Sequence, residues 1–115
     1  MKRRFRLSRS NEIKRVRRVG KSYTHPFVVL VVSSTTEIST RIAIITGKSI
    51  GGAVERNKVR RRARAICDTL LPEIKTGFHV VLIGRAPSSR ATFEELERSI
   101  ENVFRRAGLI QSLHE

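Results

Sequence analysis

Apolar residues recur at helical spacing in two regions of the first 71 residues. The first region begins near Ser10, a residue type that caps helices, and is stopped by Gly20. The second runs from Ala53 to Leu71 and is ended by Pro72. The apolar stripes consist of Ile13, Val16 and Val19 in the first region and of Val59, Ala63, Ile66 and Leu70 in the second. These patterns predict a short helix and a long one.

A third helix is predicted to begin at Thr92. Thr92 and Glu95 have the spacing of a capping box, in which each side chain accepts a hydrogen bond from the backbone of the other residue. The apolar residues that follow at helical spacing are Phe93, Leu96, Ile100, Val103 and Phe104. Gly108 is the expected end of this helix.

Three runs rich in β-branched residues predict strands over 27–33, 41–46 and 78–83. The first two are separated by a short connection that contains Glu37 and several Ser and Thr residues. Because antiparallel neighbours can be joined by such a short connection, we expect these two strands to pair as a hairpin.

The predicted order αββαβα indicates an α+β fold, a two-layer α/β sandwich whose second and third helices cover one face of the sheet. A chain of 115 residues fits one domain over 1–115, with 1–8 expected as a flexible basic arm. The longest apolar run, 27–32, is far shorter than the roughly 20 residues of a membrane span. It is also shorter than the core of a signal peptide.

Positive charge is concentrated in two parts of the chain. The sequence has 24 Lys and Arg against 10 Asp and Glu, a net charge of +14. Residues 1–22 hold ten basic residues beside Glu12, residues 41–64 hold eight beside Glu55, and from Thr92 onward acids predominate. Clustered Lys and Arg attract polyanions, so we expect a nucleic acid as partner. An anionic membrane is less favoured, because neither basic region carries a broad apolar face. A mitochondrial transit peptide fits less well, because the basic pattern continues past residue 20.

A stripe of polar residues lies beside the apolar stripe of the predicted long helix. It consists of Arg56, Asn57, Arg60, Arg61 and Arg64. Like charges four residues apart destabilise a helix by roughly 0.2–0.5 kcal/mol per pair. A solvated face normally interleaves acids, and none lies between Arg56 and Arg64. Phosphate groups explain this stripe better than a solvated surface does, since the guanidinium fork can contact two phosphate oxygens.

The glycine-rich loop before this helix does not match a nucleotide-binding loop. Gly47-Lys48-Ser49 has the expected end, but Ile42 occupies the place of the required first glycine. We instead expect Gly47, Gly51 and Gly52 to allow a tight turn, with Lys48 and the free amides of the helix start offering a further phosphate contact.

Residues 51–64, Gly-Gly-Ala-Val-Glu-Arg-Asn-Lys-Val-Arg-Arg-Arg-Ala-Arg, resemble the arginine-rich signature of the protein subunit of bacterial ribonuclease P. The order of elements agrees with that family over nearly the whole chain. The resemblance implies a mixed sheet with a left-handed βαβ crossover. It also implies an arginine helix that binds the catalytic RNA, and a cleft between the first helix and the sheet that holds the single-stranded 5′ leader of precursor tRNA.

Carried over by resemblance, the contacts to the RNA subunit come from Arg56, Asn57, Arg60, Arg61 and Arg64, with Lys48 in support. The chain departs from the family pattern at Gly52, usually Asn, at Ser49, usually basic, and at Arg62, usually apolar. In the first helix, Ile13 and Arg17 stand where the family often has aromatic residues.

The candidate leader-binding residues are Tyr23, Phe27, Arg17 and Ile13. We expect Tyr23, Phe27, Val29 and Val31 to line one face of the strand, with Arg15, Arg17 and Arg18 nearby. An aromatic ring can stack on an unpaired base, and Tyr23 suits a wet surface. Phe27 is more readily explained as a core residue.

The sequence contains no recognisable nuclease centre, and we expect no catalytic residue and no metal-binding motif in this chain. Carboxylates are not clustered for two metals, and His25, His79 and His114 are far apart. Cys67 lies inside the predicted long helix and is interpreted as a packing residue. A single cysteine excludes an internal disulfide and favours a reducing cytoplasm.

The sequence therefore predicts an accessory subunit of a ribonucleoprotein endonuclease for tRNA processing. Its partners would be a catalytic RNA, which acts with magnesium, and the precursor tRNA leader, with no membrane and no obligate protein partner. Two alternatives stay open. One is a structural ribosomal protein, which shares size and charge, and the other is a basic DNA-binding module, although no helix-turn-helix pattern is present.

Overall fold

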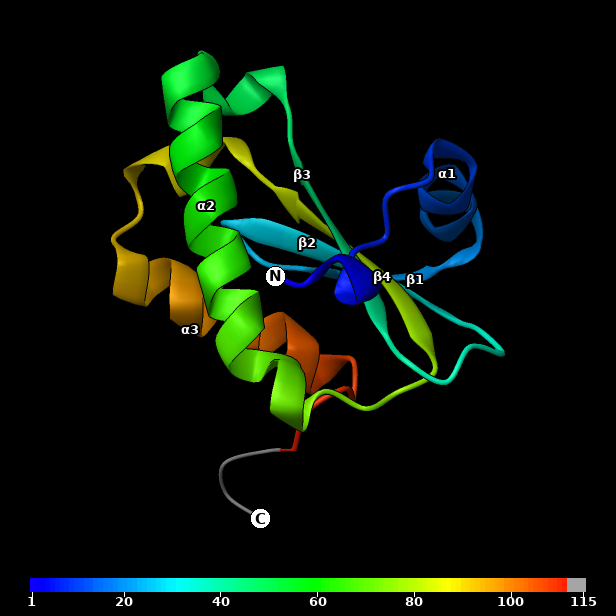
Figure 1. The fold of residues 1–115 in the computed structure, drawn as a ribbon. Helices are drawn as coiled ribbons and strands as arrows, with labels where there is room; N and C mark the ends of the chain where they lie inside the picture. The colour runs from blue at the N-terminus through cyan, green and yellow to red at the C-terminus, as the bar shows by residue number, and fades with distance from the viewer. Residues whose placement is uncertain (112–115) are drawn as a thin grey trace.

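The computed structural model describes residues 1–111, so that His114 lies outside the described residues. This part of the chain contains three α-helices and four strands (Figure 1). They are α1 (Ser10–Val19), β1 (Lys21–Thr24), β2 (Val28–Ser34), β3 (Arg41–Thr46), α2 (Ala53–Leu70), β4 (Phe78–Gly84) and α3 (Phe93–Arg106). The α+β class is confirmed, and β1 is an additional strand that makes the order αβββαβα.

The four strands form one mixed sheet in the order β1-β2-β4-β3. Strand β4 pairs antiparallel with β2 and parallel with β3, so α2 is the crossover of a βαβ unit. The predicted hairpin between 27–33 and 41–46 is wrong, because β4 lies between these two strands. Four consecutive residues of β4, from His79 to Leu82, are buried, and a strand that is apolar on both faces belongs in the centre of a sheet.

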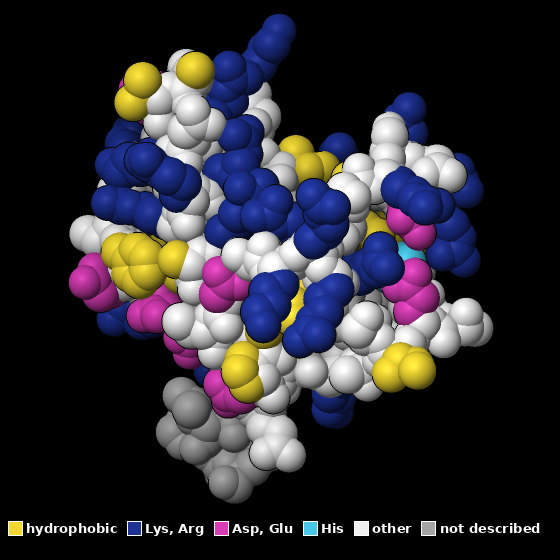
Figure 2. All heavy atoms as spheres, viewed as in Figure 1, with side chains coloured by type: hydrophobic (Ala, Val, Ile, Leu, Met, Phe, Trp, Pro, Cys, Tyr) yellow, Lys and Arg dark blue, Asp and Glu magenta, His cyan; other side chains and the backbone are white. Residues whose placement is uncertain are grey.

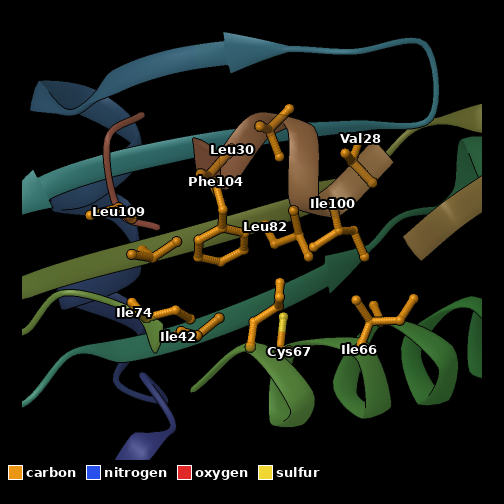
Figure 3. Packing of buried hydrophobic residues seen from close by; sticks show 14 of the residues in the cluster. Val28, Leu30, Ile42, Ile66, Cys67, Ile74, Leu82, Ile100, Phe104 and Leu109 are labelled. Atoms are coloured by element: carbon orange, nitrogen blue, oxygen red, sulfur yellow. The ribbon is translucent and has the colours of Figure 1, made fainter. Parts of the chain in front are cut away.

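Helices cover both faces of the sheet (Figure 1). Helices α2 and α3 pack together over one face, as predicted, and α1 packs against β2 and β4 on the other. The larger core lies between the sheet and the α2–α3 layer, where Figure 3 shows side chains of the strands, such as Leu82, between Phe104 of α3 and Cys67 of α2. The smaller core under α1 consists of Leu7, Val16, Val31, Ala43 and Val81.

Strand β2 directs alternate side chains to the two cores. Val28 and Leu30 belong to the larger core, whereas Val29 and Val31 face α1. Tyr23 and Phe27 also pack against the larger core, so the expectation that they share a strand face with Val29 and Val31 is wrong. Phe27 precedes β2, and its carbonyl accepts a hydrogen bond from the backbone N–H of Arg85, the residue opposite it when the register of β2 and β4 is extended by one pair.

The ends of the helices agree with the sequence patterns except at α1. The capping box of Thr92 and Glu95 is present at the start of α3. Helix α2 ends at Leu70, immediately before a short turn that contains Pro72. Helix α1 begins at Ser10, but its N-cap is Arg9 and no side chain caps it, so the cap expected near Ser10 is wrong.

The N-terminal segment, expected as an arm, lies against the sheet in the structure. The backbone N–H of Leu7 donates to the carbonyl of Ile42 at 2.9 Å, and Leu7 is buried. Within residues 1–111, no helix is both long enough and apolar enough to cross a membrane.

Candidate nucleic-acid interface

The two stripes of α2 have opposite environments. Val59, Ala63, Ile66 and Leu70 are buried against the sheet and α3, as the helical wheel predicts. Asn57 and Arg61 are exposed, and Arg56, Arg60 and Arg64 are half-buried. We call the second stripe, together with Lys48, the arginine surface. Long arginine stems can cover apolar neighbours while their guanidinium groups stay in water.

Arg60 is fixed in position by two hydrogen bonds. Its Nη1 donates to Oδ1 of Asn57, and its Nη2 donates to Oγ1 of Thr46, both at 2.7 Å. Thr46 is a buried residue at the end of β3. The guanidinium of Arg60 is therefore anchored between α2 and the sheet, which reduces the entropy lost when it binds an anion.

The positive charge of the arginine surface is not neutralised by the protein. In residues 1–111 the acidic partners of ion pairs are Glu37, Asp68 and Glu101, and none of them pairs with an arginine of α2. Figure 2 shows Lys and Arg side chains gathered over α2 and over α1, whereas acidic side chains gather near α3 at the lower left. Such a separation of charge favours binding of a polyanion on the α1–α2 side.

The loop before α2 places Lys48 beside the helix start. Lys48 is exposed in a short turn, and no side chain caps the N-terminus of α2. Gly51 has a φ of 147°, which L side chains rarely adopt, whereas Gly47 and Gly52 have negative φ. Of the three glycines in this turn, only Gly51 has a backbone conformation that requires glycine.

Arg62 has a separate role on the other flank of α2. Its Nη1 donates to the carbonyl of Ala91 at 3.2 Å, which joins α2 to the segment that precedes α3. This contact explains how an arginine is accommodated at a position that is usually apolar in the resembled family.

The four candidate leader residues fall on two faces of the sheet. Ile13 of α1 packs against the smaller core, and Arg17 of the same helix is exposed. Tyr23 and Phe27 lie on the opposite face, against the larger core. Like Ile13, the partly buried Val29, Ile45 and Ile83 pack against the smaller core, and they leave an apolar strip on the α1 face of the sheet.

A groove connects this strip to the arginine surface, and sequence reasoning missed it. Its volume is about 240 Å³, and its lining includes Ile13 of α1, Ile45 of β3 and Arg64 of α2. Sequence spacing could not reveal it, because these residues meet only after β3 has been placed at the edge of the sheet. The two surfaces predicted separately are thus neighbours in the fold.

The contacts of His25 and Cys67 indicate structural roles for these two residues. Nδ1 of His25 lies 2.6 Å from Oγ of Ser99, and burial, followed by the charge of Arg106, lowers the pKa of His25. Burial raises the pKa of the Cys67 thiol to about 12, which is consistent with packing and opposed to reactivity. Among residues 1–111, the one group of His and acidic side chains close enough to share a metal is Glu12, Glu37 and His79, which lies apart from the arginine surface.

Comparison with known families decides the assignment. The family model of ribonuclease P matches residues 1–108 of the chain. The chain belongs to the ribonuclease P protein family. The family resemblance that rests on the arginine signature is therefore confirmed, and the chain is a component of a tRNA-processing ribonuclease that also has an RNA subunit.

Relatives and solved structures of ribonuclease P proteins are similar over nearly all of the chain. The ribonuclease P protein component of Chloroflexus aurantiacus is 34% identical over 111 residues, which cover 96% of this chain and 82% of the relative. That of Bacillus cereus is 36% identical over 110 residues, which cover 95% and 96%.

Among solved structures, the Staphylococcus aureus RNase P protein superposes with a TM-score of 0.86 at 23% identity, covering 93% of this chain and 98% of that one. A Thermotoga maritima RNase P protein superposes with a TM-score of 0.81 at 26% identity, covering 88% and 98%. The fold of the ribonuclease P proteins is thus present here.

Proposed function

We propose that this protein binds the RNA subunit of ribonuclease P through the arginine surface. The observation that carries the proposal is the group of guanidiniums on α2 without acidic partners in the described structure. Binding a phosphate backbone releases condensed counterions and relieves the repulsion among Arg56, Arg60 and Arg64, which are spaced at four-residue intervals.

The proposed leader site is the α1 face of the sheet. Ile13 and the apolar strip beside it offer a surface for unpaired bases, and the exposed Arg15, Arg17 and Arg18 can contact the phosphates. Tyr23 and Phe27 are omitted from this site because they pack on the opposite face. The groove between Ile13 and Arg64 gives the two RNAs adjacent positions on one protein.

Cleavage is proposed to occur in the RNA subunit, with magnesium bound by that RNA, in the cytoplasm. The arginine surface offers cationic donors and no carboxylate oxygens, which are the ligands that Mg²⁺ prefers. The protein acts by lowering the repulsion between two polyanions and by holding the leader in place. Membership of the ribonuclease P family favours this role over that of a structural ribosomal protein or of a DNA-binding module.

Two single variants separate the two proposed sites. Arg61→Ala should weaken binding of the RNA subunit. It should leave unchanged the difference in affinity between precursor tRNA with a leader and tRNA without one. Arg17→Ala should weaken binding of precursor tRNA that carries a leader, with no effect on tRNA that lacks one. Equal losses for both substrates in Arg17→Ala would contradict the leader site, and unchanged affinity for the RNA subunit in Arg61→Ala would contradict the arginine surface.

A further inference from the structure

Phe5 is an aromatic residue outside both hydrophobic cores. It is half-buried, and it packs against neither the larger nor the smaller core. The larger core contains or contacts four of the other aromatic residues, which are Tyr23, Phe27, Phe78 and Phe104. Phe93 begins α3, the helix on which acidic side chains gather. Within residues 1–111, Phe5 is therefore the ring of a Phe or Tyr that lies among basic residues and outside a core.

The segment that carries Phe5 is fixed to the edge of the sheet. Arg3–Phe5 form one 3₁₀ turn, which the backbone N–H of Arg6 closes by donating to the carbonyl of Arg3 at 3.0 Å. Arg6 then pairs with Ile42 of β3 in a parallel bridge. A ligand of this turn therefore meets a surface that is already ordered, which lowers the entropy lost on binding.

A hollow of about 320 Å³ opens between this turn and the end of α2. We call it the N-terminal hollow, and it is lined by Met1, Lys2, Phe5, Asp68 and Leu71. Its walls thus combine an aromatic ring and aliphatic side chains with charged groups. The volume is at the small end of the range for ligand pockets and suits a single flat ring system such as a nucleobase.

The charges around the N-terminal hollow favour a nucleotide. Lys2, Arg3 and Arg4 are exposed, and their side chains make no ion pair within residues 1–111. Asp68, the acid of the lining, lies 3.0 Å from the amino group of Met1, which balances its charge. A carboxylate also accepts hydrogen bonds from the amino groups of bases. Figure 2 shows basic side chains between α2 and α1, where the N-terminal segment runs in Figure 1.

The ring of Phe5 is open to a planar partner. The guanidinium carbon of Arg4 lies 4.9 Å from the centre of this ring. A guanidinium over an aromatic face is held by the electrons of the ring, and a base stacks on such a ring in the same manner. The Arg4 contact therefore marks the face of Phe5 that a base can reach.

We propose that the N-terminal hollow holds an unpaired nucleotide of the RNA subunit. Its base lies against Phe5, and the neighbouring phosphates contact Lys2, Arg3 and Arg4. This inference rests on the proposed binding of the RNA subunit by the arginine surface. Aromatic stacking combined with basic contacts to the backbone is the usual means of binding single-stranded RNA.

The position of the hollow along α2 favours the RNA subunit over the leader. Asp68 follows Arg56, Arg60 and Arg64 at the same four-residue interval, so the hollow continues the face of α2 that carries the arginine surface. The proposed leader site around Ile13 belongs to α1, which contributes no residue to the lining of the hollow.

Phe5→Leu tests the stacking contact, because it removes the ring and keeps an apolar side chain in the turn. It should weaken binding of the RNA subunit about fivefold or more, as expected for a lost stacked base. The slope of affinity against salt on a log–log plot should stay unchanged, since no phosphate contact is lost. The matched control is Phe93→Leu, which removes a ring from α3 and should bind like the parent protein. Filter binding measures the affinities, and thermal denaturation checks that both variants fold.

Phe5→Trp gives a direct readout, because the sequence contains no other Trp. The RNA subunit should quench the fluorescence of this Trp, since a stacked base contacts the indole ring. A single-stranded leader oligonucleotide at the same concentration should leave it unchanged. Phe93→Trp is the control, and its fluorescence should change with neither RNA.

The outcomes separate this inference from the proposed function. Unchanged affinity in Phe5→Leu, together with weakened binding in Arg61→Ala, would overturn the N-terminal hollow and leave the arginine surface in place. Unchanged affinity in Arg61→Ala would contradict the arginine surface itself. Quenching of Phe5→Trp by the leader oligonucleotide and not by the RNA subunit would also overturn the inference, because it would assign the hollow to the leader.

Discussion

The arginines of α2 differ in what they contact, although the sequence presents them as one run. Arg60 bonds to Asn57 and Thr46, and Arg62 bonds to the carbonyl of Ala91. Arg61 is exposed, and its side chain makes no hydrogen bond or ion pair within the described chain. The helical wheel correctly identified the buried face of the helix. It could not identify Thr46 as a partner of Arg60, because that contact depends on how β3 ends beside α2.

These contacts predict different effects of Arg60→Ala and Arg61→Ala. Both variants should flatten the salt dependence of RNA binding, each lost phosphate contact removing roughly 0.7–0.9 from the log–log slope. Arg60→Ala should also lower the free energy of unfolding by about 1 kcal/mol, because it leaves the buried Thr46 hydroxyl without its partner. Arg61→Ala should change stability by less than about 0.5 kcal/mol. Filter binding at several salt concentrations and urea denaturation measure the two effects. An unchanged slope in both variants would mean that these arginines are only solvated surface.

At the scale of elements, the sequence predicted the three α-helices and three of the four strands found within residues 1–111. It missed β1 because only Tyr23 among its four residues is even partly buried, so no apolar pattern marks this edge strand. It mispaired β2 and β3 because a short connection suggested a hairpin. The pairing is decided instead by β4, whose burial on both faces requires the central place. Tyr23 was expected beside α1, but it belongs to β1, where it pairs with Leu30 and faces the larger core. Phe27 packs against the same core.

Gly20 determines how closely α1 approaches the sheet. A Cβ at this position would lie 2.5 Å from the carbonyl oxygen of Val16 and 2.7 Å from Cγ1 of Val31. Gly20→Ala should therefore destabilise the protein by about 1–3 kcal/mol and should weaken leader binding. Gly47→Ala is the matched control, since a Cβ there meets nothing within 4 Å and its φ is negative. Thermal denaturation compares the two, and equal melting temperatures would contradict the close approach of α1.

The capping box of α3 predicts a pH dependence of stability. The backbone N–H of Thr92 donates to Oε1 of Glu95 at 2.8 Å, and this bond, followed by the bond between Thr92 and Glu95 side-chain groups, lowers the pKa of Glu95. A lowered folded-state pKa means that the stabilisation is present above the ordinary carboxyl pKa and is lost as pH falls through the lowered one. Glu95→Gln should therefore show a shallower loss of stability below about pH 5 than the parent protein. Parallel pH profiles for the two proteins, measured by urea denaturation, would contradict this role.

At the scale of the whole molecule, the net charge of +14 is divided between faces. The groove is lined by Arg64 of the arginine surface and by Ile13 of α1, the helix that also carries basic residues, while acidic residues gather on α3 (Figure 2). Two basic surfaces side by side can hold two RNAs together, and the acidic face disfavours other orientations. Sequence clustering predicted the two basic regions, but their adjacency depends on the placement of β3 at the edge of the sheet, where Ile45 lines the groove with Ile13 of α1 and Arg64 of α2.

The central claim is tested most directly by reconstituted cleavage of precursor tRNA at low magnesium. The matching RNA subunit is assayed alone, with the parent protein, and with a triple variant that replaces Arg56, Arg61 and Arg64 by Ala. A control variant replaces the exposed Lys75, Arg90 and Arg98 by Ala, which removes the same charge elsewhere. We predict that the parent and the control variant stimulate cleavage, that the arginine variant does not, and that the protein alone cleaves nothing. Equal stimulation by both variants, or cleavage by the protein without RNA, would contradict the account.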